Sequence, residues 1–182
     1  MGLTDFPTNG EPREAIVAYS MIETGNWTLP VNNGGDIAYK PPLFHWCIAA
    51  LSSIAGKVTE YTSRMPSALA LIAMVLGGFL FYAKRRGASV ALLMGLITLS
   101  NFEVHRAGMN CRVDMMLTAF IVLALYQLYR WCEKGQKGFP WIATLFMGCA
   151  TLTKGPVGIL LPCMVTGVFL VIRGTSFFKA FF

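Results

Sequence analysis

Two acidic residues are candidates for chemistry: Glu11 in the polar head of the chain, and Asp114 at the start of a long apolar stretch. An ionisable group at the edge of a membrane span is costly to bury, so each is a functional candidate. One histidine and five cations occur in the same regions: Arg13, Lys40, His105, Arg106, Arg112 and Lys154. Paired acids can supply a general base and hold an acceptor. Clustered Arg and Lys suit a phosphate at a membrane surface.

Several of these residues also have an ordinary structural interpretation. Arg13 could form a surface ion pair with Glu11 or Glu14, which contributes little to stability. Arg112 followed by Asp114 is typical of a charged pair at the start of a helix, where an acid is favourable. These alternatives stay open at the level of sequence.

His105 and Lys154 are weaker candidates when each is taken alone. A single histidine is more often a satisfied polar residue than a ligand, and Lys154 could simply extend its ammonium to the membrane surface. The argument for a site therefore depends on the joint placement of all these groups on one side of the membrane.

Membrane helices are the elements that must position these residues. The 182 residues are 55% hydrophobic and only 13% charged, whereas a soluble domain carries about 25% charged residues. This composition excludes a disordered chain, a collagen-like chain and an ordinary cytosolic enzyme, and it predicts an all-α polytopic membrane protein. The net charge of +6 indicates membrane orientation rather than a nucleic-acid partner.

Six apolar stretches are candidate membrane segments. They are Leu43–Ala55, Pro66–Ala83, Ala88–Phe102, Met115–Trp131, Phe139–Leu152 and Pro156–Ile172. A perpendicular span needs roughly 20 apolar residues, with about 17 as the lower limit. The second, fourth and sixth stretches meet this limit, whereas the third and fifth need flanking residues to extend them. The first stretch is the shortest and follows two prolines.

Basic residues indicate the orientation of these segments. The turn at Lys84-Arg85-Arg86 is the strongest signal for a cytoplasmic loop. With residues 1–65 outside, the inner side holds eight Lys/Arg and one acid, and the outer side holds seven Lys/Arg and eight acids. We therefore expect an outer loop over 1–65, with Leu43–Ala55 as a re-entrant or juxtamembrane helix. Five transmembrane helices should follow within 66–182, in a single membrane domain.

The outer loop should contain an amphipathic helix over residues 11–24. Its apolar stripe should lie on the bilayer and consists of Ala15, Ile16, Tyr19 and Ile22. The polar face should consist of Glu11, Arg13, Glu14 and Glu23. A solvated loop is the alternative. Because this polar loop follows neither a signal peptide nor a span, we expect the chain to be part of a longer protein.

An ordered set of short motifs resembles one enzyme family. The motifs are Gly10-Glu-Pro-Arg-Glu-Ala15, Glu23-Thr-Gly-Asn-Trp-Thr-Leu-Pro30, Tyr39-Lys-Pro-Pro-Leu43, Ser63-Arg-Met-Pro-Ser-Ala-Leu69, Arg112-Val-Asp-Met-Met-Leu117 and Leu152-Thr-Lys-Gly-Pro156. Together they resemble bacterial glycosyltransferases related to protein O-mannosyltransferases, including the aminoarabinose transferases that modify lipid A. The resemblance covers nearly the whole chain.

The resemblance implies a helical membrane fold called GT-C and a sugar donor carried on a polyprenyl phosphate. It also implies an inverting transfer to a protein, lipid A or glycan acceptor on the non-cytoplasmic face of a bacterial inner membrane. Members of the family begin with a transmembrane helix before the first motif and continue well beyond this length. They place the lysine-proline segment in a juxtamembrane helix, in agreement with the charge argument.

The first motif departs from the family pattern, because Gly10 stands where many relatives have an aspartate. The expected mechanism therefore assigns proton removal from the acceptor to Glu11, with Asp114 as the alternative. Cations among Arg13, Lys40, Arg106, Arg112 and Lys154 would stabilise the phosphate leaving group. With fixed cations present and no metal-ligand spacing in the sequence, we expect neither a metal nor a cofactor.

Two other classes of function stay open. A transporter or lipid-handling protein would use the outer charges as a substrate vestibule, although it usually has polar or interrupted helices at the membrane midplane. A structural subunit, or an inactive truncated remnant of the enzyme, would retain the fold without the reaction.

Overall fold

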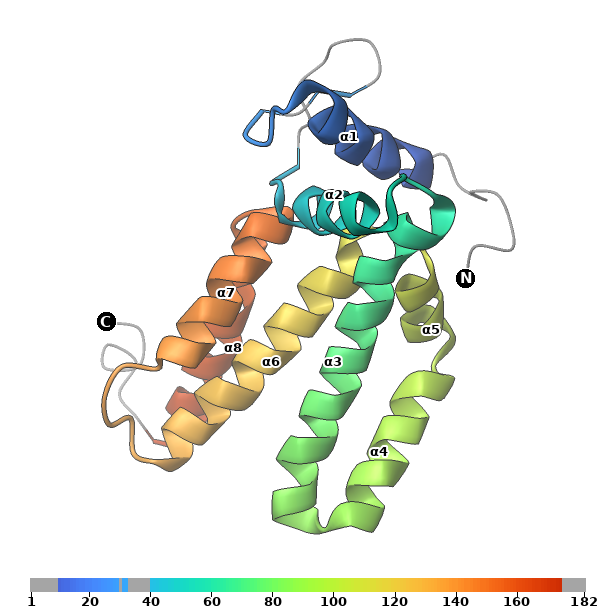
Figure 1. The fold of residues 1–182 in the computed structure, drawn as a ribbon. Helices are drawn as coiled ribbons and strands as arrows, with labels where there is room; N and C mark the ends of the chain where they lie inside the picture. The colour runs from blue at the N-terminus through green and yellow to red at the C-terminus, as the bar shows by residue number, and fades with distance from the viewer. Residues whose placement is uncertain (1–9, 30, 33–39, 175–182) are drawn as a thin grey trace.

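The computed structural model describes residues 10–29, 31–32 and 40–174 of the chain. These residues form the helices α1 (Gly10–Thr24), α2 (Leu43–Ala55), α3 (Glu60–Arg86), α4 (Ala88–Ser100), α5 (Phe102–Met109), α6 (Val113–Glu133), α7 (Trp141–Lys154) and α8 (Val157–Ile172). Figure 1 shows a bundle built around α3, α6, α7 and α8, with α1 and α2 lying across one end of it. The all-α fold expected from composition is confirmed.

In the described part of the chain, two helices are long and apolar enough to cross a membrane by themselves, α3 and α6. A third crossing is available if α4 and α5 count as one span, although they are bent by 71° at Asn101. The side chain of Asn101 accepts hydrogen bonds from the backbone N–H groups of Glu103 and Val104, so it starts a new helix at the bend. Helices α7 and α8 have 14 and 16 residues. The five-span arrangement stays a prediction.

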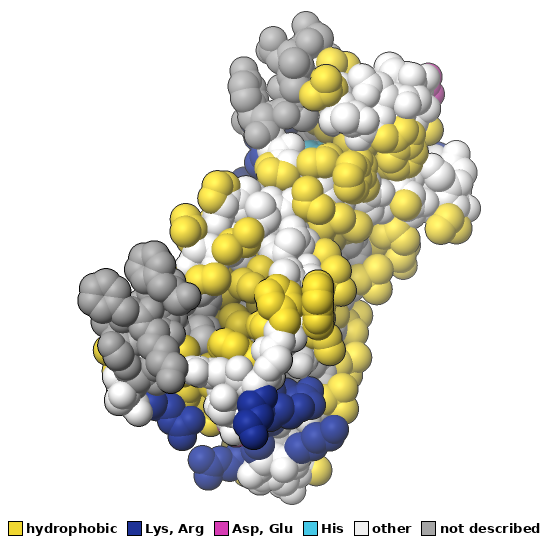
Figure 2. All heavy atoms as spheres, turned by 90° about the vertical axis from the view of Figure 1, so that its left-hand side faces the viewer, with side chains coloured by type: hydrophobic (Ala, Val, Ile, Leu, Met, Phe, Trp, Pro, Cys, Tyr) yellow, Lys and Arg dark blue, Asp and Glu magenta, His cyan; other side chains and the backbone are white. Residues whose placement is uncertain are grey.

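The two ends of the bundle differ in charge. The end that we call the basic end contains the turn after α3, the turn between α6 and α7, and the end of α8. Its cations are Lys84, Arg85, Arg86, Arg130, Lys134, Lys137 and Arg173. Figure 2 shows Lys and Arg side chains gathered at this end, below a largely apolar body. Exposed apolar side chains cover α4, α7 and α8, as expected for helices that face lipid.

The structure corrects the prediction for α1, whose bounds agree closely with the expected helix. Its buried apolar residues are Ala15, which belongs to the predicted stripe, and Val17, Ala18 and Met21, which pack in one core cluster with Phe44 and Ile48 of α2. By contrast, three members of the predicted apolar stripe are exposed: Ile16, Tyr19 and Ile22. The helix therefore packs through a different face, which also carries Glu11 and Glu14.

Candidate functional site

Glu11 joins α1 to two other parts of the chain. Its side chain is fully buried, and Oε1 accepts hydrogen bonds from the Cys111 backbone N–H at 2.8 Å and from Arg64 Nε at 3.3 Å. Arg64 lies in α3 and is itself 4% exposed. The expectation that Glu11 stays on a polar, solvated face is wrong. The buried arginine compensates its charge.

Glu14 lies one helical turn further along α1 and has different partners. Its Oε2 is 2.6 Å from His45 Nε2, and its Oε1 is bonded to the ammonium of Lys40. Both Glu14 and His45 are buried, whereas the Lys40 side chain is 30% exposed. Burial raises the pKa of Glu14, but the hydrogen bonds from His45 and Lys40 outweigh burial and hold that pKa below its ordinary value. The Lys40 ammonium is thus held by a buried, ionised carboxylate.

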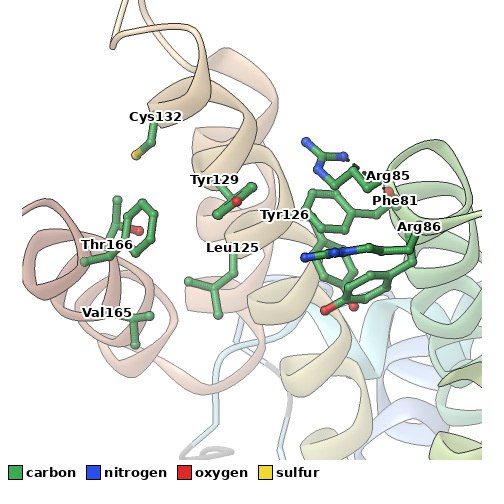
Figure 3. Close-up of a pocket in the computed structure, with 11 residues that line it drawn as sticks. Phe81, Arg85, Arg86, Leu125, Tyr126, Tyr129, Cys132, Val165 and Thr166 are labelled. Carbon is green, nitrogen blue, oxygen red and sulfur yellow. Dashed lines mark hydrogen bonds between the residues drawn. The ribbon is translucent and has the colours of Figure 1, made fainter. Parts of the chain in front are cut away.

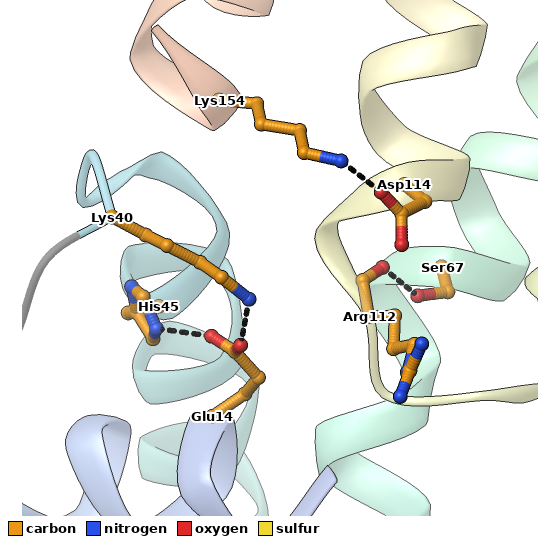
Figure 4. Close-up of polar contacts among 7 residues, drawn as sticks. All are labelled: Glu14, Lys40, His45, Ser67, Arg112, Asp114 and Lys154. Carbon is orange, nitrogen blue, oxygen red and sulfur yellow. Dashed lines mark hydrogen bonds and ion pairs between the residues drawn. The ribbon is translucent and has the colours of Figure 1, made fainter. Parts of the chain in front are cut away.

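Asp114 forms the second acid–cation pair of the site. It occupies the first turn of α6, and its Oδ1 lies 2.5 Å from Lys154 Nζ at the end of α7. The two side chains are 47% and 45% exposed. The structure thus pairs Asp114 with Lys154, whereas the sequence suggested a helix-start pair with Arg112. Figure 4 shows this pair and the Glu14 cluster at the same end of the molecule.

Arg112 lies two residues before Asp114 in the chain, and its side chain is close to Gly10 in space. A Cβ atom added at Gly10 would lie 3.1 Å from Arg112 Nη2. The Arg112 backbone carbonyl accepts a hydrogen bond from Ser67 Oγ at 3.1 Å, which ties this segment to α3. The exposed guanidinium has no ion pair within the described ranges. Arg112 is thus an exposed cation next to a glycine, with no ion pair in the described part of the chain.

The buried thiol of Cys111 lies close enough to the charged groups of the site to be affected by them. Burial, together with the charges of Glu14 and Glu11, raises its pKa, while Arg64 and Lys40 lower it to a smaller extent. All four charged groups therefore act on one atom. The segment before α6 is hydrogen-bonded to Glu11 through the Cys111 N–H and leads directly to Asp114.

The remaining predicted site residues lie apart from this arrangement. Arg13 is exposed on α1 and, among the described residues, pairs with neither Glu11 nor Glu14. Arg106 on α5 is bonded instead to Glu103, with Nη2 2.8 Å from Oε2, and neighbouring His105 is exposed. In the described part of the chain, no group of three or more His, Cys, Asp or Glu residues could hold a metal ion.

Sequence reasoning missed four residues that shape the site: Glu14, His45, Arg64 and Ser67. Glu11 and Glu14 are three residues apart and therefore share one face of a helix. That spacing indicates that Glu14 shares a helix face with Glu11, but it does not show whether this face is solvated or buried. No local pattern connects His45 or Arg64 to these acids, because their partners lie 31 and 53 residues away.

The fold matches a solved structure of a membrane enzyme bound to a lipid phosphate. ArnT from Cupriavidus metallidurans, in its crystal structure bound to undecaprenyl phosphate, aligns with 99% of this chain at a TM-score of 0.84 and 24% sequence identity. The aligned part is 34% of that protein. The likeness confirms the GT-C-like helical membrane fold and a multi-pass membrane protein.

The sequence identifies the family. Residues 39–181 match the family described as dolichyl-phosphate-mannose-protein mannosyltransferase. The chain therefore belongs to this glycosyltransferase family. Similar proteins include the undecaprenyl phosphate-alpha-4-amino-4-deoxy-L-arabinose arabinosyl transferase of Shewanella sediminis, 29% identical over 177 residues, which cover 94% of this chain and 32% of that protein. The Proteus mirabilis transferase 2 of the same name is 29% identical over 178 residues, covering 88% and 31%. The chain thus spans about a third of the length of these relatives.

Proposed function

We propose that this protein transfers a sugar from a polyprenyl-phosphate donor to a lipid, protein or glycan acceptor, with inversion, on the non-cytoplasmic face of a bacterial inner membrane. Two acid–cation groups at the α1–α2 end of a membrane bundle carry this proposal. Family membership and a fold shared with a protein crystallised with undecaprenyl phosphate support it. The basic end of the bundle lies opposite and suits the cytoplasmic side.

The geometry favours Asp114 over Glu11 as the acid that meets the acceptor. The Asp114 side chain is about half exposed, whereas Glu11 is fully buried against Arg64 and Cys111. In the proposed step, the acceptor hydroxyl oxygen bonds to the anomeric carbon while its proton moves to the Asp114 carboxylate. The bond between that carbon and the phosphate oxygen breaks, and its electron pair stays on the phosphate.

The proposed phosphate ligands are Lys40, Arg112 and Lys154. Each is exposed or partly exposed at the α1–α2 end, and each can donate charge-assisted hydrogen bonds. They would stabilise the negative charge that develops on the leaving phosphate. Arg13, His105 and Arg106 belong to the same outer side, and we propose a more distant role for them in donor or acceptor binding.

A transfer assay with a radiolabelled polyprenyl-phosphate sugar tests the proposal. Asp114→Asn should lower the transfer rate about 100-fold or more, the usual range for loss of a general base. Glu11→Gln should act mainly through the amount of folded protein. Transfer that is unchanged per folded molecule in both variants would refute an acid role for either residue.

Gly10 favours a second candidate function, that of a remnant that binds the donor without transferring the sugar. The position that carries an acid in many relatives has no side chain here, and the nearby Arg112 has no ion pair among the described residues. Donor binding measured on the wild-type protein separates the two functions. Binding without transfer would establish the remnant, and transfer would exclude it.

A further inference from the structure

A groove opens between α3, α6 and α8 at the basic end, far from the proposed site. Its volume is about 400 Å³. The walls are mainly apolar or aromatic, with Phe81 from α3, Leu125 and Tyr129 from α6, and Val165 and Phe169 from α8. Figure 3 shows Arg85 and Arg86 reaching from α3 toward the other two helices.

Two arginines line the groove, Arg85 and Arg86, and a third, Arg173, lies beside its wall at the end of α8. The guanidinium of Arg85 lies 3.9 Å from the Phe81 ring centroid and forms an ion pair with Glu133. Arg85 is therefore a fixed part of the wall. Exposed Arg86 and Arg173 form no ion pair with any described residue. Arg173 lies 5.3 Å from the centroid of the Phe169 ring that lines the groove.

This combination selects a particular kind of ligand. A soluble anion would match the arginines but would leave the apolar walls uncovered, and a neutral lipid would leave both charges uncompensated. A lipid with a negatively charged headgroup matches both features, since its phosphate bonds the guanidinium groups while an acyl chain covers the walls. Anionic lipids of the cytoplasmic leaflet attract basic residues at this level of the membrane.

We propose that this groove binds an anionic phospholipid of the cytoplasmic leaflet. The headgroup lies at the basic end, where Arg86 and Arg173 attract its phosphate, and one acyl chain follows Leu125, Val165 and Phe169. This site is separate from the proposed sugar-transfer site, because the two lie at opposite ends of the bundle. Its failure would leave the proposed function untouched.

Native mass spectrometry of the detergent-purified protein, titrated with phosphatidylglycerol or phosphatidylcholine, tests the proposal. The wild-type protein should bind phosphatidylglycerol about tenfold more tightly than phosphatidylcholine. The double variant Arg86→Gln/Arg173→Gln should lose this preference, because it loses the charge-assisted bonds. Lys84→Gln/Lys137→Gln removes the same charge from the same end without touching the groove, and it should keep the preference.

A blocking variant and a soluble competitor distinguish a lipid seated in the groove from an anion bound only at its rim. Thr166→Trp fills the groove without changing the charge and should also weaken phosphatidylglycerol binding. Glycerol 3-phosphate, which has the headgroup chemistry but no acyl chain, should not compete. An equal loss in the lysine control, or effective competition by glycerol 3-phosphate, would overturn the proposal. A preference that appears only after deletion of residues 175–182 would assign the groove to that segment instead.

Discussion

Glu11 and Glu14 show how much the surroundings of a side chain decide its role. Both are buried on the same face of α1, but Glu11 is bonded to Arg64 and to the backbone of Cys111, while Glu14 is bonded to His45 and Lys40. One acid therefore joins three segments of the fold. The other holds a partly exposed cation that the donor phosphate could reach.

Glu11→Gln should destabilise the protein by about 3 kcal/mol, because it removes the negative charge beside buried Arg64. Chemical denaturation in detergent measures the free energy of unfolding. Glu23→Gln is the control, since Glu23 is exposed on the same helix. Equal stability of the two variants would show that the buried carboxylate is not needed for the fold.

Gly10→Asp should place a carboxylate beside Arg112 and form a new ion pair. The added Cβ would lie 3.1 Å from the tip of a flexible side chain, which can move by a few tenths of an ångström. If the missing acid limits the reaction, transfer should rise by about 100-fold. Gly10→Asn tests the charge, because it has the same shape and should give no gain. A comparable gain in both variants would contradict the charge argument.

The pKa of Glu14 predicts a specific dependence of stability on pH. Its pKa in the folded protein lies below the ordinary value of 4.5. The stabilisation is therefore fully present above about pH 4.5 and is lost as the pH falls through the lower folded pKa. Thermal unfolding from pH 7 to pH 3 should show wild type and Glu14→Gln converging as the pH falls. A difference that stays constant over this range would contradict the prediction.

At the scale of elements, α7 and α8 form a tight hairpin that positions Lys154. Gly155 adopts a φ of +86° at the turn, a conformation that favours glycine. A Cβ atom added at Gly158 would lie 2.4 Å from the Thr151 backbone nitrogen. The two helices therefore approach more closely than any side chain at position 158 would allow.

Gly158→Ala should destabilise the hairpin by about 1–3 kcal/mol, because backbone atoms cannot yield as a side chain would. The midpoint of thermal unfolding in detergent measures the effect. Gly148→Ala in α7 is a matched control, since its added Cβ would meet no atom within 4 Å. Loss of stability in both variants alike would contradict the close-packing argument, because alanine alone favours a helix over glycine.

Helix bounds were largely predictable, whereas helix faces were not. The expected helix at Leu43–Ala55 has the observed bounds, and the one expected over 11–24 starts a residue earlier. Local signals such as proline, glycine and apolar runs set these limits. The buried face of α1 was predicted wrongly, because hydropathy counts a carboxylate as polar whether or not a distant cation compensates it.

At the scale of the whole molecule, the separation of charges predicts the orientation. With the basic end in the cytoplasm, a cysteine introduced at Glu23 should react with a membrane-impermeant maleimide in intact cells. A cysteine at Lys134 should react only after the membrane is opened. Both native side chains are exposed, so access decides the result. The native cysteines would first be replaced by alanine, and the reverse labelling pattern would invert the topology.

The sequence by itself determined that this is a helical membrane protein, which ends carry basic residues, and which family it resembles. These properties are local or compositional, so they can be seen without knowing what packs against what. Tertiary structure alone decided the ion pairs, because Lys154 meets Asp114 across 40 residues and Glu11 meets the Cys111 backbone across 100. Such distant partners decide whether an acid is buried and stabilises the fold or is exposed and available for chemistry. They supply the opposite charge that makes burial of the acid tolerable.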